Sequence, residues 1–160
     1  MTAVTIVEAR APSDVDSVRR LIDEYAASLD VSLCFQDLAH ELEHLREVYA
    51  PPRGELLLAR RDGVDLGCVA FRPFDPDTCE MKRLYVRPEA RGRAVGHLLA
   101  SGAIERACVR GYQRIVLDTL STMTAARALY RSLGFRETAP YYRNPLAGVV
   151  YMELAVMSGR

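Results

Sequence analysis

A strand, a short loop with two glycines, a helix and a second strand follow one another in the middle of the chain. Residues 81–86 (MKRLYV) predict the first strand, and residues 91–96 (RGRAVG) form the loop. A helix extends from there to Gly111, a residue suited to ending a helix, and residues 115–117 (IVL) begin the next strand. Such a βαβ unit crosses over right-handedly, so its two strands are parallel. The chain is therefore expected to build an α/β sheet.

Further elements are predicted on both sides of this unit. Apolar residues at three- and four-residue intervals predict helices at 13–29, 38–49 and 123–133. Runs rich in β-branched or apolar residues predict strands at 4–8, 55–60, 66–71 and 149–154. The turn at 61–63 (RDG) makes an antiparallel hairpin, whose pairing Pro73 and Pro76 are expected to end. The predicted order β, α, α, β, β, β, α, β, α, β, β implies a mixed central sheet with helices on both faces.

Length, charge and hydropathy exclude several classes of protein. The 160 residues are 49% hydrophobic and 26% charged, with no repeat or linker, so one domain over residues 1–160 is expected. Lys plus Arg and Asp plus Glu both number 21, without the basic excess of a nucleic-acid-binding protein. No apolar run reaches the roughly eighteen residues of a membrane span, and the N-terminus lacks a secretion signal. We therefore expect a cytoplasmic protein without nucleic-acid or membrane partners.

The cysteines suggest neither disulfides nor a metal site. Cys34, Cys68, Cys79 and Cys108 lie far apart and form no CxxC pair. We expect buried, reduced thiols and no metal cofactor.

The loop at 91–96 is suited to binding phosphate. Small residues let a ligand approach the backbone, and the start of the following helix presents N–H groups and the positive end of its dipole. Arg91 and Arg93 add positive charge. The loop lacks the Gly-Lys-Ser/Thr ending of a P-loop and contains no GxGxxG. Taken alone, it is equally compatible with an ordinary strand-to-helix turn.

Two segments together resemble the signatures of the GNAT superfamily of N-acetyltransferases. The loop matches Gln/Arg-x-x-Gly-x-Gly/Ala, with Ala94 at the usual first glycine, where a positive φ would be strained. Residues 80–92 resemble the strand that precedes this loop, and residues 128–135 (ALYRSLGF) resemble the helix that ends in Leu-Gly-Phe. The predicted elements fit the family from Val4 to Leu154. The resemblance implies a GNAT-like fold that transfers an acetyl group from the cosubstrate acetyl-CoA to a primary amine of a small molecule or peptide, by direct attack in a ternary complex.

The resemblance also implies roles for individual residues. The acetyl-CoA-binding residues would be Leu84, Tyr85 and Val86 through their main chain, and Arg91, Gly92, Arg93, Ala94, Val95 and Gly96 at the pyrophosphate. Tyr130 would protonate the departing thiolate, and Glu80 would deprotonate the amine, often through water. Tyr142, Arg143 and Asn144 would border the acceptor site. A homodimer, with the final strand as an edge, is the assembly expected by analogy. Each role has a structural alternative: a packed aromatic at Tyr130, a solvated or paired carboxylate at Glu80 and a plain loop at 142–144.

Two other functions stay open. One is a non-catalytic domain that binds acetyl-CoA as a sensor or interaction module. The other is a zinc hydrolase, because residues 40–44 (HELEH) match HExxH. His40 and His44 lie beside the apolar stripe of their helix, and the third histidine, His97, lies in the predicted acetyl-CoA helix, so we expect a solvated pair. Cys79 beside Glu80 suggests a covalent route, but without a histidine nearby in sequence we expect an inert thiol.

Overall fold

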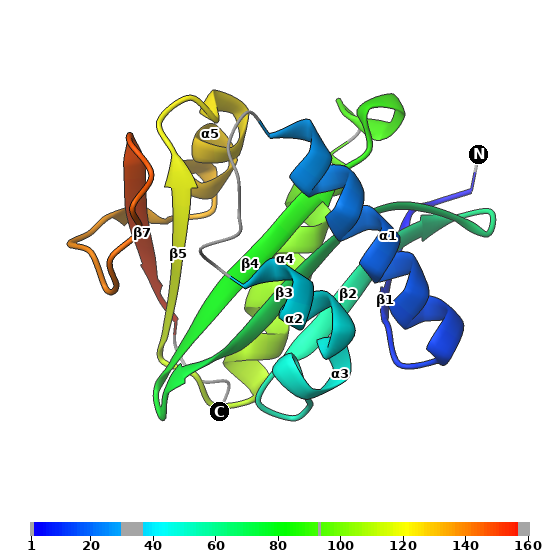
Figure 1. Ribbon diagram of the computed structural model, residues 1–160, viewed down its shortest axis with the longest axis horizontal. Helices are drawn as coiled ribbons and strands as arrows, with labels where there is room; N and C mark the ends of the chain where they lie inside the picture. Colours follow the sequence, from blue (N-terminus) through cyan, green and yellow to red (C-terminus); the bar gives the residue numbers. More distant parts are fainter. Residues whose placement is uncertain (1, 30–36, 93, 157–160) are drawn as a thin grey trace.

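The protein is built on one seven-stranded sheet with the strand order β1-β2-β3-β4-β5-β7-β6 (Figure 1). The computed structural model describes residues 2–29, 37–92 and 94–156, so Cys34 and Arg93 lie outside the described residues. The strands are β1 (Thr5–Glu8), β2 (Glu55–Arg61), β3 (Val64–Asp75), β4 (Thr78–Val86), β5 (Arg114–Leu120), β6 (Arg136–Glu137) and β7 (Val149–Ala155). The helices are α1 (Pro12–Ser28), α2 (Leu38–Glu43), α3 (Leu45–Val48), α4 (Val95–Val109) and α5 (Thr124–Ser132), with a 3-10 turn η2 (Pro88–Ala90).

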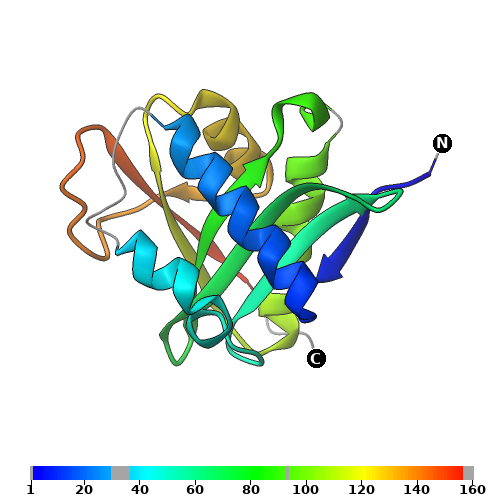
Figure 2. The same ribbon diagram turned by 45° about the vertical axis from the view of Figure 1, so that its right-hand side comes forward.

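Helices cover both faces of the sheet, as Figures 1 and 2 show. The stripe of Val15, Val18, Leu21 and Ile22 buries α1 against one face. α4 lies on the other face and packs against β2, β3 and β4. The β4 side chains alternate between two apolar cores: Leu84 and Val86 contact the core of α4, and Tyr85 that of α1. The α/β class with a mixed sheet, predicted from the sequence, is confirmed.

The sheet opens between β4 and β5. These parallel strands pair only where Thr78, Cys79 and Glu80 face Arg114, Ile115 and Val116. Beyond that point the strands diverge (Figure 1), while β5 stays paired with β7 along its whole length. The main-chain edge of β4 beyond Glu80 therefore has no strand beside it on the β5 side.

A β-bulge lies in the part of β4 that borders this opening. Tyr85 is paired with Cys68 and Lys82 with Ala70, so Arg83 and Leu84 together oppose one residue of β3. Arg83 has a φ of 62°, in the left-handed region. The bulge changes the direction of β4 next to the opening.

Two predicted details are wrong. The helix expected over 38–49 is divided at His44, whose φ of −124° is not helical and whose N–H donates to both His40 and Glu41 carbonyls. Pairing of β3 does not stop at Pro73, which faces Cys79, and it continues to Asp75 through a register shift. A proline is tolerated there because the irregular ladder does not need its N–H.

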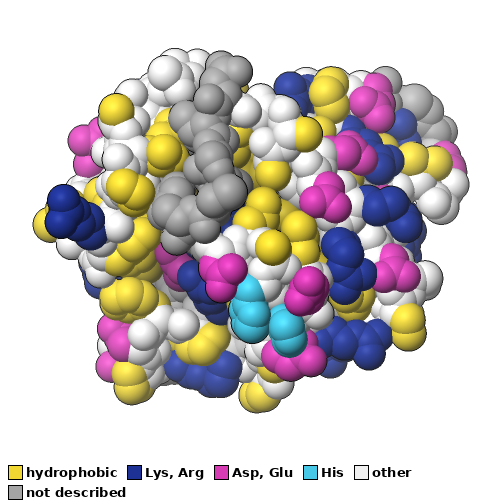
Figure 3. Space-filling model, in the orientation of Figure 1, with side chains coloured by type: hydrophobic (Ala, Val, Ile, Leu, Met, Phe, Trp, Pro, Cys, Tyr) yellow, Lys and Arg dark blue, Asp and Glu magenta, His cyan; other side chains and the backbone are white. Residues whose placement is uncertain are grey.

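Charged side chains of both signs are interspersed over the face shown in Figure 3. Among the helices of the described residues, none has the length and hydropathy of a membrane span.

Candidate active site

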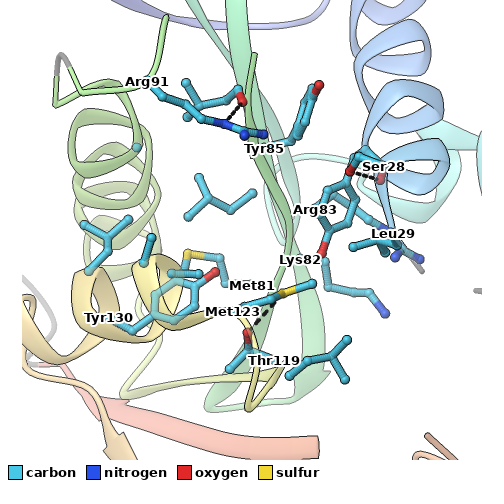
Figure 4. A pocket seen from close by; sticks show the side chains of 18 of the residues that line it. Ser28, Leu29, Met81, Lys82, Arg83, Tyr85, Arg91, Thr119, Met123 and Tyr130 are labelled. Carbon is cyan, nitrogen blue, oxygen red and sulfur yellow. Dashed lines mark hydrogen bonds between the residues drawn. The ribbon is translucent and has the colours of Figure 1, made fainter. Parts of the chain in front are cut away.

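A pocket of about 480 Å³ occupies the opening between β4 and β5 (Figure 4). Its walls are residues 81–86 of β4, the loop that leads into α4, the end of β5, one side of α5 and the end of α1. Figure 4 shows α4 and α5 on one side of β4 and α1 on the other. The pocket thus has one wall in each layer of the fold.

Eight of the nine predicted acetyl-CoA-binding residues line this pocket: Leu84, Tyr85, Val86, Arg91, Gly92, Ala94, Val95 and Gly96. The ninth, Arg93, lies outside the described residues. The Arg91 Nε donates to the Val86 carbonyl at 3.0 Å, which ties the loop to the end of β4.

Two of the described residues of the loop that leads into α4 have a positive φ. Gly92 has a φ of 82°, and Ala94, the residue that precedes the helix, has a φ of 60°. The strain expected if Ala94 took this conformation is therefore present. The first turn of α4 starts directly after it, and the first N–H groups of a helix have no partner within the helix. These donors lie where the loop lines the pocket.

Replacing Ala94 with glycine should stabilise the protein. Glycine adopts a positive φ without strain, and this gain exceeds the extra freedom of glycine in the unfolded chain, so the free energy of unfolding should rise by about 0.5 to 1 kcal/mol. Urea unfolding measures it. Ala128→Gly, at an exposed position within α5, is the control and should lower the same quantity by about 1 kcal/mol. Destabilisation by both variants would contradict a strained Ala94.

Tyr130 lies on α5 and is 7% exposed, with its ring edge-on to Phe135 at 5.7 Å between centroids. Figure 4 shows its hydroxyl pointing from α5 into the pocket. Burial raises the pKa of Tyr130, and the charge of Asp118 adds to this effect. The phenol therefore keeps its proton at neutral pH.

Glu80 is held away from this pocket. Its carboxylate is buried and accepts hydrogen bonds from Arg72 Nε at 3.1 Å and from the Tyr141 hydroxyl at 2.6 Å. Among the described residues, those that line the pocket do not include Glu80. The structure thus shows the paired glutamate that the sequence left as the alternative and does not bring Glu80 beside Tyr130.

The predicted acceptor residues meet at Asp118. The Tyr142 hydroxyl and the Asn144 Nδ2 both donate to Asp118 Oδ2, the second at 2.8 Å. Asp118 and Asn144 line the pocket, and Tyr142 contacts it through its hydrogen bond to Asp118. Arg143 is exposed and does not join them.

Sequence reasoning missed several residues of the pocket. Asp118 and Thr119 come from the end of β5 and Met123 directly precedes α5, and the Thr119 hydroxyl lies 3.5 Å from the Met123 sulfur. Tyr25, Ser28 and Leu29 come from the end of α1, and Lys82 and Arg83 come from β4. The signal for Asp118 was a carboxylate directly after the apolar run Ile115, Val116 and Leu117.

The HExxH segment has a different structure from a zinc site. The Glu41 carboxylate is buried and accepts two hydrogen bonds from Arg83, both at 2.9 Å, and one from the Tyr49 hydroxyl at 2.9 Å. The His40 and His44 rings stack at the surface, 4.2 Å between centroids (Figure 3). Among the described residues, no group of three or more His, Cys, Asp or Glu side chains is arranged to hold a metal. Glu41 thus serves to anchor the β4 bulge.

Cys79, the thiol next to Glu80, lies in the core. It is fully buried, and burial raises the pKa of its thiol to about 12. The inert thiol expected at this position is therefore consistent with its surroundings.

Comparison with known proteins agrees with this geometry. Residues 18–135 match the Acetyltransferase (GNAT) family. An N-acetyltransferase of Schizosaccharomyces pombe, itself uncharacterised, is 46% identical over 153 residues, with 94% of each chain covered. An acetyltransferase structure from Streptococcus agalactiae has a TM-score of 0.80 at 22% identity, covering 98% of this chain and 100% of that one. The yncA protein of Salmonella typhimurium, solved with its cofactor acetyl-CoA, has a TM-score of 0.74 at 20% identity, covering 99% and 97%. The chain belongs to the GNAT superfamily of N-acetyltransferases.

Proposed function

We propose that this protein transfers the acetyl group of acetyl-CoA directly to a primary amine. The observation that carries the proposal is the Tyr130 hydroxyl, which points into the same pocket that eight of the predicted acetyl-CoA-binding residues line. The residues present also fit this cosubstrate. The start of α4 offers backbone N–H groups to a pyrophosphate, and the unpaired edge of β4 offers main-chain groups to a pantetheine arm.

In this reaction the amine nitrogen forms a bond with the thioester carbon, the carbon–sulfur bond breaks, and the nitrogen loses a proton while the thiolate gains one. Main-chain N–H groups of β4 stabilise the carbonyl oxygen as it gains charge. Tyr130 donates its proton to the sulfur as the carbon–sulfur bond breaks and negative charge develops there. Burial raises the pKa of Tyr130, so the phenol carries the proton before transfer, and the tyrosinate left behind regains a proton from solvent. Direct transfer needs no covalent intermediate on the protein.

Glu80 is not placed to take the amine proton directly, as the simplest form of the sequence hypothesis would have it. Glu80 would have to act through a relay, because its carboxylate is engaged by Arg72 and Tyr141. Water or the Tyr141 hydroxyl would be that relay. Asp118 lines the pocket itself and is a second candidate for contact with the amine.

Tyr130→Phe tests the proposal. Removing only the hydroxyl should lower kcat about 100-fold, a usual contribution of a general acid, and leave the Kd for acetyl-CoA within about threefold. Release of the CoA thiol from acetyl-CoA, with a panel of amines as acceptors, measures kcat. Calorimetric titration with acetyl-CoA measures the Kd. Tyr112→Phe removes another buried hydroxyl, bonded to the Arg53 carbonyl outside the pocket, and should leave kcat unchanged.

Two results distinguish the alternatives. An unchanged kcat in Tyr130→Phe would show that Tyr130 is only a packed aromatic. Acetyl-CoA binding without thiol release for any amine in the panel would favour the sensor function. In the wild type the acid should stay protonated to above about pH 10, because burial raises the pKa of Tyr130.

A further inference from the structure

Asp118 lines the pocket with a carboxylate whose hydrogen-bonding partners in the protein are neutral. Its Oδ2 accepts from the Tyr142 hydroxyl and from the Asn144 Nδ2, and these two bonds fix its orientation. Within the described part of the chain, no hydrogen bond reaches Oδ1 and no cation forms an ion pair with this carboxylate. Asp118 therefore favours a cationic group on a ligand in the pocket.

Tyr25 brings a neutral hydroxyl to the same part of the pocket. It lies near the end of α1 and lines the pocket. Burial raises the pKa of Tyr25, and the charge of Asp118 adds to this effect, so the phenol keeps its proton. Among the described residues, Ser28 donates to the Tyr25 carbonyl, and nothing is bonded to the Tyr25 hydroxyl. This oxygen is placed to accept a second hydrogen bond from an ammonium group bound at Asp118.

Three half-buried leucines line the pocket beside these polar groups. Leu29 directly follows α1, Leu120 is the last residue of β5, and Leu146 lies in the loop before β7. Because side chains alternate along a strand, Leu120 shares a face of β5 with Asp118, opposite Leu117 in the core of α4. Figure 4 shows Leu29 on the α1 side of β4. Apolar surface from three elements thus adjoins the carboxylate.

Asn144 connects Asp118 to this apolar wall. Its Nδ2 donates to Asp118 Oδ2 at 2.8 Å, and its Oδ1 accepts from the Leu146 N–H at 3.0 Å. Its own N–H donates to the Tyr151 hydroxyl at 3.1 Å, which ties the loop to β7. Hydrogen bonds therefore hold the carboxylate and Leu146 in a fixed relation to each other.

The two cations that line the pocket from β4 beyond Met81, Lys82 and Arg83, are engaged within the protein. Arg83 donates two hydrogen bonds to Glu41, both at 2.9 Å. Lys82 is 9% exposed and interacts with other groups of the protein. Burial lowers the pKa of Lys82, and the charge of Glu80 opposes that effect. Neither cation calls for a carboxylate on the acceptor.

We infer that the acceptor is a primary amine with an uncharged, apolar body. Its ammonium group binds Asp118 and the Tyr25 hydroxyl, and its body packs against the three leucines. This inference rests on the proposed function and names the substrate class of the same site. A free amino acid would bring a second carboxylate towards Asp118. A polyamine or a peptide would place charged or amide groups against the leucines.

The experiment compares acceptors that differ in one group. Release of the CoA thiol is measured with pentylamine, with norleucine, which adds a carboxylate beside the amine, and with cadaverine, which adds a second amine at the far end. Pentylamine should exceed both in kcat/KM by about 100-fold. From ethylamine to pentylamine, each added methylene should raise kcat/KM by about fourfold. Norleucine or cadaverine preferred over pentylamine would overturn the inference.

Leu146→Ala tests the apolar wall. It should lower kcat/KM for pentylamine about tenfold and leave that for ethylamine within about threefold, because the short chain of ethylamine offers the leucine little surface. Leu98→Ala removes a leucine that is 40% exposed on α4, outside the pocket lining, and should change neither. Equal losses for both amines in Leu146→Ala would overturn the inference, since a merely structural leucine predicts that outcome.

Asp118→Asn tests the ammonium contact. Because both amines carry the same ammonium group, this variant should raise KM for ethylamine and for pentylamine by a similar factor of about 30. Asp23→Asn removes an exposed carboxylate of α1 outside the pocket lining and should change neither. Thermal melting checks that each variant folds. An unchanged KM in folded Asp118→Asn would overturn the inference.

A binding measurement separates this inference from the proposed function. Calorimetry on the protein saturated with CoA, which has no acetyl group to transfer, measures the Kd of each amine. Pentylamine should bind at least about tenfold more tightly than norleucine and cadaverine. That order without thiol release from acetyl-CoA would support the inference and contradict the proposed function. Thiol release without any preference for pentylamine in binding would leave the proposed function intact and overturn the inference.

Discussion

Gly96→Glu is expected to remove measurable acetyl-CoA binding. Gly96 lies in the first turn of α4 and lines the pocket, where a Cβ would lie 3.3 Å from Leu129 Cδ2 and 3.7 Å from Val86 Cγ2. A larger side chain at this position must displace α5 or enter the pocket. Its carboxylate would then compete for the N–H groups proposed to bind pyrophosphate and would repel that group. Together these effects should weaken binding at least about 1,000-fold, or roughly 4 kcal/mol.

Calorimetric titration with acetyl-CoA measures this loss, and thermal melting shows whether the variant folds. His97→Glu is the matched control, because it adds the same charge to the next residue of α4 at an exposed position outside the pocket lining. That variant should bind with a Kd within about threefold of the wild type. A folded Gly96→Glu protein with an unchanged Kd would show that the pyrophosphate does not bind at the start of α4.

The parts of the site that could be predicted from the sequence are local in the chain. The segment at 91–96 contains both positive-φ residues that turn the chain from β4 into α4, and its small residues are needed for that turn. Tyr130 is predicted from the resemblance of residues 128–135 to the family helix that ends in Leu-Gly-Phe, and in the structure this segment is helical up to Ser132. Both signatures are short runs of sequence, so the resemblance could identify these residues without any knowledge of the sheet.

The pocket residues that could not be predicted from the sequence depend on long-range strand pairing. Asp118 lines the pocket only because β5 leaves β4 after Val116, and nothing in the run RIVLDTL shows where that pairing ends. Lys82 and Arg83 both face the α1 side because of the bulge, which breaks the simple alternation expected of β4. The strand could be predicted, whereas the faces of its residues at the bulge could not.

Glu41 shows how a motif can mislead. Its spacing from His40 and His44 fits HExxH, but its hydrogen-bonding partner, Arg83, lies 42 residues away in sequence. Only the packing of α2 on the sheet brings the two together. The motif would give the Glu41 carboxylate the role of activating a metal-bound water. In the structure this carboxylate is the counter-ion of Arg83 in the β4 bulge.

Glu41→Ala is expected to lower the free energy of unfolding by about 3 to 5 kcal/mol. The Glu41 and Arg83 side chains are only 5% and 4% exposed, so the variant leaves a buried guanidinium without its counter-ion. The Tyr49 hydroxyl loses its acceptor as well. Urea unfolding measures the change, and Glu43→Ala, at an exposed position on the same helix, should change the free energy by less than about 0.5 kcal/mol. Combining Glu41→Leu with Arg83→Met should recover most of the loss, because two apolar side chains leave no charge buried.

The same pair predicts a dependence on pH. Burial by itself would raise the pKa of the Glu41 carboxyl, but the hydrogen bonds and charge of Arg83 outweigh it, so the pKa is lowered. A lowered pKa in the folded state stabilises the protein above the unfolded-state value of about 4.3, and this contribution disappears as the pH falls through the folded-state value. The difference in unfolding free energy between wild type and Glu41→Ala should therefore be constant from pH 8 to pH 5 and should shrink on further acidification. A difference that instead grows as the pH falls from 7 towards 4 would show that the pKa of the Glu41 carboxyl is raised in the folded protein, and the anchoring of the β4 bulge by a charged Glu41 would then be wrong.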